Sequence, residues 1–407
     1  MDIRKSSIFN IAQDAQVSIN LQGRQSFEQT GMEAFGLNME KMPDKVLLKI
    51  FSYMSHGDIM RMARVCKKWR LVAYDSRLWQ VVSFRPEYNG LQVLSLEALL
   101  TLISVRFGPL LRYIELPMEL ITPAVLHELA TKCPNLHNLT LDFSTAMQLH
   151  DFNELREFPQ HLTHMTICLS EVIFMEGFMR KIYGFVALLE VMHLVGTYER
   201  IDQEEEIYEV INIHKLKSYI PNLRMVNMYG VSFVDDSHVE SISSNCIHLE
   251  GLAVNFCLKF KGSSLKTLLQ RCRKLRTLLM QHTDLQDEYL MNVDWAKTAI
   301  ENVDVSSTLL SAEALTDMLT RVPGIVWFAA AHVDGMNSSV VEQILERADL
   351  RHLSAIDVSH CENLSEDVLL KLLRRIAPQL QGMLLGGFPQ LLEQFWMCLL
   401  PLLKNIK

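Results

Sequence analysis

The residues best placed by type and spacing to do chemistry are His161, His164 and Cys168, which lie within eight positions of one another. Imidazole and thiolate groups are common zinc ligands, so this spacing raises the possibility of a metal site. His164 and Cys168 fall on one predicted strand, and the sequence offers no fourth ligand close to them. We therefore interpret these histidines as structural, and we expect neither a metal nor another cofactor in this protein.

Motifs that mark enzyme active sites are missing from the sequence. It contains no P-loop, no H-E-x-x-H, no G-x-S-x-G and no dinucleotide-binding fingerprint. Cys66 lies in a helical segment, where burial against a partner explains it better than nucleophilic catalysis does. Since no nucleophile and base can be paired, we expect no catalytic residue and no enzymatic activity in this chain.

Length and composition favour an array of domains or repeats. The chain has 407 residues, 49% of them hydrophobic, and a formal net charge of −8. That length exceeds what one hydrophobic core usually serves. The negative charge argues against binding to nucleic acid or to an anionic membrane surface. No run of 18 apolar residues occurs, and the eight cysteines form no C-x-x-C pair. The first residues, MDIRKSSIFNIAQDAQ, lack a continuous apolar core, so we do not expect them to act as a signal peptide. We expect a soluble intracellular protein, located in the cytoplasm, the nucleus or both.

The segment from Met42 to Trp79 has apolar residues at helical spacing throughout. Pro43 suits the first turn of a helix, and Asp58 is expected to cap the next one. About forty residues in short helices rarely bury enough surface to fold alone. The segment has more apolar residues than so small a unit can hide, so some of them are expected to face a partner. The apolar faces are Val46, Leu47, Ile50, Phe51 and Met54, followed by Ile59, Met62, Cys66, Trp69 and Ala73.

These residues resemble an F-box, the motif that binds the Skp1 adaptor of cullin–RING ubiquitin ligases. Met42, Lys45 and Met54 depart from the Leu, Glu and Leu of the family pattern, and of these only Lys45 reverses a charge. We refer to residues 41–85 as the F-box segment. The pattern is matched in order and spacing by Pro43, Ile50–Tyr53, Val65–Arg70 and Leu78–Trp79. The resemblance implies an adaptor-binding surface made of Pro43, Val46, Leu47, Ile50, Phe51, Val65, Cys66 and Trp69.

Beyond the F-box segment the pattern L-x-x-L-x-L recurs eleven times, as in Leu136, Leu139 and Leu141. The first residues of successive patterns lie 25 to 34 positions apart. Such a period is typical of leucine-rich repeats, in which each repeat gives a short inner strand and a returning outer helix. One repeat cannot bury its own apolar side, so neighbours must stack. The first residues are Leu111, Leu136, Leu162, Leu189, Leu223, Leu249, Leu275, Ile300, Ile325, Leu353 and Leu380.

Two further positions agree with a repeat array. Cys133, Cys246 and Cys272 precede the first leucine by three residues, where buried thiols act as small hydrophobes. Eight residues after it, small polar side chains that can bond backbone groups at the turn occur in seven repeats. These are Ser144, Ser170, Thr197, Cys257, Thr283, Thr308 and Cys361. From 42 to 400 the chain thus resembles the F-box/leucine-rich-repeat family, which implies an α/β fold with a three-helix F-box and a curved solenoid, strands on the concave face and helices on the convex face.

We expect a disordered tail (1–40), the F-box segment (41–85), a solenoid of about eleven repeats (86–386) and a C-terminal cap (387–407). The longest interval between repeats contains the acidic run Asp202–Glu206. This insertion is interpreted either as a solvated loop or as an element that binds a basic partner. The apolar segment after Gly386 is expected to cover the last repeat, or else to fold back and shape the partner surface.

Residues two, four and six places after each first leucine are expected to face the concave surface. Their mixture of polar and aromatic side chains suits protein recognition. Trp327 is of the type that dominates binding energies, although a Trp packed beneath the neighbouring repeat is equally compatible with the sequence. The candidate substrate-binding residues are His164, His193, Asn227, Tyr229, Asn255, Asp304, Trp327 and Asp357.

The family resemblance implies the substrate-recognition subunit of a Skp1–cullin–F-box ubiquitin ligase. Its partners would be a Skp1-like adaptor, a cullin–RING complex reached through that adaptor, and a target protein, with no nucleic acid and no membrane. Holding the target near a charged conjugating enzyme would contribute proximity, which accelerates a reaction without any catalytic group. A repeat scaffold or inhibitor that binds the adaptor without promoting ubiquitination is the alternative that the sequence leaves open.

Overall fold

A computed structural model describes residues 42–85, 90–93, 95–170, 172–196, 208–389 and 391–406. The chain divides into two compact units, residues 1–47 and 48–407, and only residues 42–47 of the first are described. The expected disordered tail and the acidic run Asp202–Glu206 therefore lie outside the described residues. Apart from the first residues of one helix, every described element belongs to the second unit.

The F-box segment forms three α-helices, as expected, followed by a 3-10 turn. Ser55 caps the second helix, because its hydroxyl accepts from the backbone N–H of Asp58 at 3.2 Å. The prediction that Asp58 is the cap is wrong: Asp58 lies inside the first turn and pairs with Arg61 at 2.8 Å. Cys66 caps the third helix, where its sulfur accepts from the N–H of Trp69 at 3.4 Å. The elements are α2 (Asp44–Phe51), α3 (His56–Met62), α4 (Lys67–Ala73) and η3 (Ser76–Leu78).

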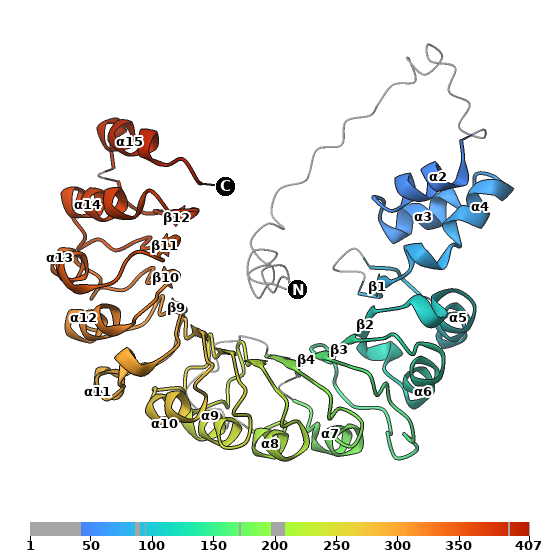
Figure 1. Ribbon diagram of the computed structural model, residues 1–407. Helices are drawn as coiled ribbons and strands as arrows, with labels where there is room; N and C mark the ends of the chain where they lie inside the picture. Colours follow the sequence, from blue (N-terminus) through green and yellow to red (C-terminus); the bar gives the residue numbers. More distant parts are fainter. Residues whose placement is uncertain are drawn as a thin grey trace, which may run out of the picture. The chain divides into compact units, whose positions relative to one another are not determined.

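The described strands of the second unit form one parallel sheet in sequence order, β1 to β12, and they line its inner side in Figure 1. Parallel neighbours in sequence order mean that each connection crosses once over the same face and returns. The strands are β1 (Val81–Ser83), β2 (Tyr113–Pro117), β3 (Asn138–Asp142), β4 (His164–Cys168), β5 (Val191–Val195), β6 (Met225–Asn227), β7 (Gly251–Ala253), β8 (Thr277–Leu279), β9 (Asn302–Asp304), β10 (Trp327–Ala329), β11 (Ala355–Asp357) and β12 (Gly382–Leu384).

The second residue of each predicted L-x-x-L-x-L pattern forms one continuous row across the sheet. Leu139 pairs with Met165, and Leu252 pairs with Leu278, in the same register as every other neighbouring pair. This row is buried from β1 to β11, with at most 3% of any side chain exposed. The predicted repeat spacing and the leucine-rich-repeat solenoid are therefore confirmed.

The sheet begins earlier than expected, at β1, inside the predicted F-box segment. Val82 pairs with Ile114, and the Ser83 hydroxyl donates to a carboxylate oxygen of Glu115 at 2.6 Å. Arg85 then pairs with Asp142 at 2.7 Å. No L-x-x-L-x-L pattern precedes this strand, so periodicity could not reveal it. Residue 86 is consequently not where the solenoid starts.

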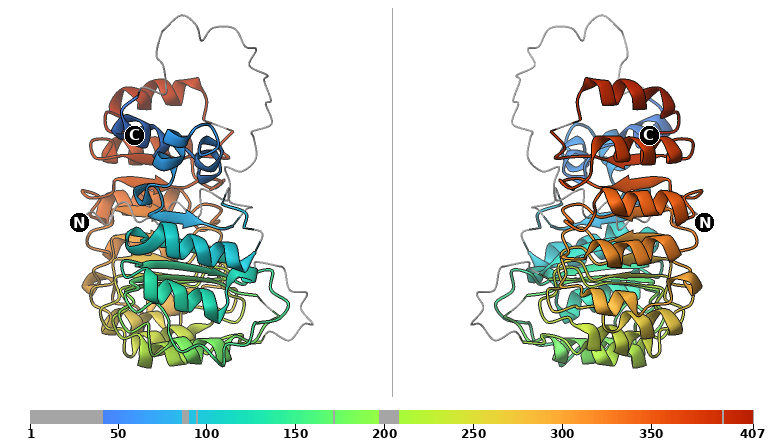
Figure 2. Two further views of the ribbon diagram at one scale, coloured as in Figure 1. Left: turned by 90° about the vertical axis from the view of Figure 1, so that its right-hand side faces the viewer. Right: turned by 90° about the vertical axis from the view of Figure 1, so that its left-hand side faces the viewer.

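The returning segments lie on the outer side of the sheet, stacked next to one another in Figures 1 and 2. The returning outer helix expected of the repeats is present, for example, over Ala312–Arg321, Ser338–Arg347 and Glu366–Ile376. The outer elements are α5 (Leu96–Leu102), η5 (Ile103–Phe107), η6 (Gly108–Leu110), η7 (Met118–Leu120), α6 (Pro123–Lys132), α7 (Glu176–Ile182), η8 (Ile213–Lys215), α8 (Leu216–Tyr219), α9 (Asp236–Ser243), α10 (Leu265–Arg271), α11 (Asp287–Met291), η9 (Trp295–Lys297), α12 (Ala312–Arg321), α13 (Ser338–Arg347) and α14 (Glu366–Ile376).

From β6 onward each strand is three residues long and ends in the same left-handed turn. In seven successive repeats the residue seven places after the first leucine has a positive φ. Five of these residues are not glycine, and a left-handed conformation costs such residues about 1–2 kcal/mol. Each of their N–H groups donates to a carbonyl of the next repeat, as His282 does to Ser306 at 2.8 Å, which offsets that cost. The residues are Gly230, Phe256, His282, Ser307, His332, His360 and Gly387.

The small polar side chains expected at the turns bond backbone carbonyls, as predicted. The Cys257 thiol donates to the carbonyl of Met228 at 2.9 Å, and the Cys361 thiol donates to that of Ala330 at 3.1 Å. Thr308 and Ser170 do the same with their hydroxyls, at 2.6 and 2.9 Å. Ser144 instead donates to the carboxylate of Asp142. Thr197 lies outside the described residues.

The third F-box helix and its following turn are attached to the first repeat by an aromatic cluster. Trp79 is fully buried, and its indole N–H donates to the carbonyl of Ala73 at 2.9 Å. Its ring stacks on His56 at 4.8 Å and lies 6.0 Å from Phe107, which in turn lies 6.0 Å from Phe84. The F-box helices from residue 48 onward are thus continuous with the core of the solenoid.

The C-terminal segment forms α15 (Glu393–Leu399) and η10 (Leu400–Leu402), which follow β12. Phe395 and Leu399 are buried, and α15 packs against α14, as a cap of the last repeat should. Leu392 and Met397 remain 68% and 69% exposed, so the cap is not a fully polar one. Among the helices that the structure describes, not one has the length and apolar content needed to cross a bilayer.

Candidate docking surfaces

The predicted adaptor-binding residues divide into exposed, half-buried and buried side chains. Val46, Ile50 and Val65 are 43%, 37% and 59% exposed, and Pro43 is exposed as well. Cys66 and Trp69 are half-buried. Leu47 and Phe51, in contrast, are 0% and 1% exposed. A side chain with no exposed area cannot contact an adaptor, so the assignment of Leu47 and Phe51 to the adaptor surface is wrong.

Phe51 has a structural role inside the F-box segment. Its ring meets that of Trp69 edge to face, with 5.6 Å between centroids and an interplanar angle of 77°. Such aromatic pairs add about 0.5–1.5 kcal/mol beyond the burial of their area. The indole N–H of Trp69 is also buried and has no hydrogen-bond partner within the described residues. The Phe51–Trp69 contact therefore holds the helices together and leaves the outward side of the segment to other residues.

Two exposed residues of the F-box segment were missed by the sequence reasoning. Tyr53 and Leu71 are 77% and 76% exposed. The Lys49 ammonium lies 4.7 Å above the Tyr53 ring. Leu71 falls outside the spacing that Trp69 and Ala73 share with the buried stripe. An apolar residue off that stripe was the signal available in the sequence.

Three of the predicted substrate-binding residues are committed to the turns of the solenoid. The side-chain oxygen of Asn255 accepts from the backbone N–H of Gln281 at 3.0 Å. Asp304 and Asp357 accept from the N–H two residues further on, each at 2.9 Å. Only 9% of Asp304 is exposed. Their polar groups already satisfy the backbone, so these residues are corrected to structural residues.

Burial also shifts the pKa values of several predicted substrate-binding residues. Burial raises the pKa of Asp304 to about 6, and the nearby Asp357 carboxyl adds to this effect. Burial lowers the pKa of His193 to about 4, assisted by His164, and lowers that of His164 as well. His193 Nδ1 and Asn227 Oδ1 are buried without hydrogen-bond partners among the described residues. Asn227 is only 5% exposed, so it offers little surface to a target protein and its place in the predicted set is also corrected.

The remaining candidates are His164, His193, Tyr229 and Trp327, all of them half-buried. The Tyr229 ring lies 5.1 Å from that of Phe256, at the start of the left-handed turns. Trp327 pairs in register with Ala355, and the next strand has Gly382 at that position. The residue paired with Trp327 on the next strand is therefore a small one, Ala355.

The buried thiols of the repeats are unreactive by the same argument of burial. Burial raises the pKa of Cys133, Cys246 and Cys257 to about 12. It raises the pKa of Cys272 and Cys361 to about 11. A thiol acts as nucleophile only as the thiolate, so these groups are packing residues, as expected.

Comparison with known proteins agrees with this architecture. The F-box-like family matches residues 39–85. Human F-box/LRR-repeat protein 12 is 36% identical over 106 residues, which cover 25% of this chain and 32% of that protein. The Caenorhabditis elegans "Putative RNA-binding protein EEED8.10" is 22% identical over 350 residues, which cover 82% of this chain and 45% of that protein. The matched parts are thus less than half the length of these relatives.

A chain in the crystal structure of the yeast Rad7 and Elc1 complex has a similar fold. The two chains superpose with a TM-score of 0.55, and the match covers 100% of this chain and 92% of the other. Their sequences are 13% identical, so the likeness concerns the fold alone. The predicted F-box resemblance and the solenoid architecture are both confirmed by these matches.

Proposed function

Because the chain is an F-box/leucine-rich-repeat protein, we propose that it is the substrate-recognition subunit of a Skp1–cullin–F-box ubiquitin ligase. In this proposal the F-box segment binds a Skp1-like adaptor, and the repeats bind a target protein for ubiquitination and degradation. The chain supplies position and no chemistry, because holding two reactants together accelerates their reaction. The proposed location of this activity is the cytoplasm, the nucleus or both.

The observation that supports docking is the exposure of large apolar residues in a segment whose aromatic core is complete. Phe51, Trp69 and Trp79 already pack against one another or against the first repeat. Val65 and Leu71 nevertheless remain 59% and 76% exposed. Exposed apolar side chains of this size gathered in one short segment are typical of a protein interaction site.

The test has to avoid the buried core. A Phe51→Ala variant would unfold the segment and lose the adaptor for that reason alone, so it is a poor probe of the interface. Val65→Asp combined with Leu71→Asp places charges on exposed positions only. Leu309→Asp is the matched control, since Leu309 is 90% exposed but lies in the solenoid.

The full chain and both variants would be expressed with an affinity tag, and co-purified Skp1 would be quantified. We expect wild type and Leu309→Asp to retain Skp1 equally and the double variant to lose at least tenfold. Equal Skp1 in all three samples would contradict the proposed interface. Loss in Leu309→Asp as well would also contradict it, because that charge lies outside the F-box segment.

The other ligase subunits distinguish the proposed function from the alternative, a scaffold or inhibitor. We expect the cullin and the RING subunit to co-purify with the wild-type chain, and a captured protein to gain ubiquitin in a reconstituted reaction. Skp1 without cullin, or a complete complex that transfers no ubiquitin to any captured protein, would favour the scaffold. We propose no RNA binding for this chain, because its net charge of −8 disfavours nucleic acid and the match to the worm relative covers only 45% of that protein.

For target binding we propose the half-buried Trp327, together with His164 and Tyr229. A half-buried Trp beside small residues resembles the centre of a protein interface, where aromatic anchors supply most of the binding energy. Proximity labelling with the wild-type chain, with Trp327→Ala and with Trp327→Phe would test this. We expect Trp327→Ala to lose the labelled targets while retaining Skp1, and Trp327→Phe to keep part of them. Unchanged targets with Trp327→Ala would contradict the assignment.

A further inference from the structure

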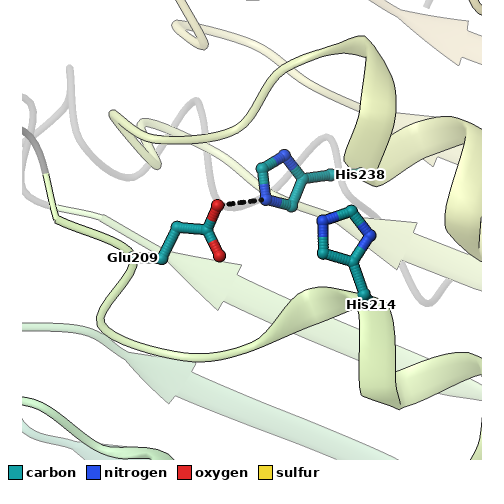
Figure 3. Close-up of side chains that lie close together, drawn as sticks. All are labelled: Glu209, His214 and His238. Atoms are coloured by element: carbon teal, nitrogen blue, oxygen red, sulfur yellow. Dashed lines mark ion pairs between the residues drawn. The ribbon is translucent and has the colours of Figure 1, made fainter.

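Three side chains that could ligate a metal meet on the outer side of the solenoid. Glu209 follows residues 197–207, His214 lies in η8, and His238 lies in the first turn of α9. One ligand atom from each lies within 4.8 Å of the other two. Figure 3 shows the Glu209 carboxylate and the two imidazole rings directed toward one another.

His238 is the buried member of this group, with 2% of its side chain exposed. Its Nδ1 lies 2.7 Å from a carboxylate oxygen of Asp235, the N-cap of α9. Nδ1 also lies 3.2 Å from the backbone N–H of Asp235, so the ring has two tautomers with a partner at Nδ1. The tautomer that donates from Nδ1 to the carboxylate leaves a lone pair on Nε2, and this is the one that metal binding requires. Nε2 is buried and has no hydrogen-bond partner within the described residues. A buried polar atom without a hydrogen-bond partner costs about 1–3 kcal/mol of folding free energy, and a ligand bound to this nitrogen would offset that cost.

The unpartnered nitrogen is aimed at the other two groups. His238 Nε2 lies 3.4 Å from Glu209 Oε1, and the ring of His214 stacks on that of His238 with 4.7 Å between centroids. Zinc bonds of about 2.0–2.1 Å to nitrogen and oxygen place neighbouring tetrahedral ligands about 3.4 Å apart. The nitrogen–oxygen distance already has this value. The remaining separations have to close by about 1.4 Å at most, within reach of rotations of the more exposed Glu209 and His214.

Residues around the cluster fix His238 in place. Asp235 also accepts from the hydroxyl and the backbone N–H of Ser237, at 2.7 and 2.9 Å. The ring of Phe233 meets His238 edge to face at 5.8 Å. A carboxylate behind a metal-binding histidine sets its tautomer and makes it a better donor, and an apolar side shields the site from water. This arrangement is more than three polar residues that happen to be close.

We propose that Glu209, His214 and His238 bind one Zn²⁺ ion, with water as the fourth ligand. Two imidazoles and one carboxylate form a donor set that zinc accepts with an open fourth position. The ion would join Glu209 to η8 and α9, and so connect two successive repeats. This site is independent of the proposed ligase function and involves no reaction.

The test uses the full chain, stripped of metal with a chelator and then equilibrated with Zn²⁺ alone. Bound zinc would be counted by mass spectrometry after gel filtration, in wild type, His214→Ala and Glu209→Gln. His332→Ala is the matched control, because His332 stacks on His360 at 4.1 Å and so belongs to a second histidine pair. His238 is left unchanged, since it also closes the cap of α9.

We expect about one zinc ion more in wild type and His332→Ala than in the other two variants, whose affinity should fall at least tenfold. Adding Zn²⁺ should raise the melting temperature of wild type and His332→Ala only. Equal zinc binding in all four proteins, or none in wild type, would overturn the proposal.

Replacement of zinc by Co²⁺ separates this site from one formed by cysteines. We expect the visible bands of a cobalt ion with nitrogen and oxygen donors, and we expect His214→Ala to weaken them. Intense thiolate-to-metal charge-transfer bands that persist in His214→Ala would contradict the proposal, because they would place the ion on cysteine sulfur.

Discussion

The F-box helices and the repeat sheet differ in how much of their apolar side chains they leave exposed. In the sheet, the row that includes Leu139 and Leu252 is at most 3% exposed from β1 to β11, because each repeat covers the next. In the F-box segment, Val65 and Leu71 remain more than half exposed although the aromatic core is complete. Stacked repeats bury the inner row of their sheet without a partner, whereas a small helical unit leaves apolar surface that a partner can cover.

The two regions are nevertheless not independent. Trp79 carries the end of the F-box segment into the core of the first repeat, and Arg106 of η5 lies 3.3 Å from the centre of the Tyr74 ring. An adaptor bound at α3 and α4 would therefore be held on a rigid support and not on a flexible linker. Such a support suits a subunit whose role is to hold a target at a fixed place.

The largest expected effect concerns this connection. Trp79→Ala removes a fully buried indole and its hydrogen bond to Ala73, so we expect a loss of about 3–5 kcal/mol in the free energy of unfolding. Urea denaturation followed by circular dichroism would measure it. Leu71→Ala is the control, expected to stay within about 0.5 kcal/mol of wild type because its side chain is exposed. Similar stability of both variants would mean that the F-box helices are not seated on the solenoid.

The second prediction concerns Asp304, a buried polar residue of the repeat sheet whose carboxyl bonds the backbone. The pKa of Asp304 is about 6 in the folded chain, above its ordinary value of 3.8. Ionisation therefore costs folded-state stability as pH rises from about 4 to 6, and below pH 4 this cost is absent. Asp304→Asn keeps the acceptor for Ser306 and removes the charge, so it should stabilise the protein above pH 6 by at most about 3 kcal/mol.

Denaturant titrations at pH 7.5 and pH 4 would measure this difference. The gain of Asp304→Asn over wild type should be present at the higher pH and should vanish at the lower one. Asp357→Asn serves as the control, because Asp357 is half-exposed and bonds the equivalent backbone N–H. A gain that is the same at both values would show that ionisation of Asp304 is not the cause.

The smallest expected effect is chemical and compares thiols of the two regions. At pH 8 a thiol with a pKa of about 12 is about 0.01% thiolate, so Cys246 and Cys257 should resist iodoacetamide. Cys66 in the F-box segment is half-buried and Cys398 in α15 is exposed, so both should be alkylated. Peptide mass spectrometry of the native chain would report each site. Labelling of Cys257 at the rate of Cys398 would show that the repeats open far more readily than their burial implies.

Periodicity in the sequence was enough to predict the solenoid. A ladder of apolar residues at a period in the twenties admits one stacked arrangement, so its register followed from the leucines alone. The strand β1 was not predicted, because its three residues carry no such pattern. The hydrogen bonds that Asn255 and Asp304 accept from backbone N–H groups of the turns were not predicted either, because they depend on backbone geometry that residue types do not specify.

The F-box surface was predicted only in part, for a different reason. The family pattern identifies residues that fit together, but it does not say which of them face inward. Phe51 matches that pattern because it packs against Trp69, while Leu71 lies outside it and is exposed. The cluster of Glu209, His214 and His238 could not be recognised at all, since its members come from separate elements and form no known spacing.

The central claim is that an adaptor binds the F-box helices, and hydrogen–deuterium exchange of the full chain with and without purified Skp1 tests it most directly. We predict slower backbone exchange in α3, in α4 and at the end of α2 when Skp1 is present, with no change in β7 to β12. Unchanged exchange in these helices, or protection confined to the concave strands, would contradict the account.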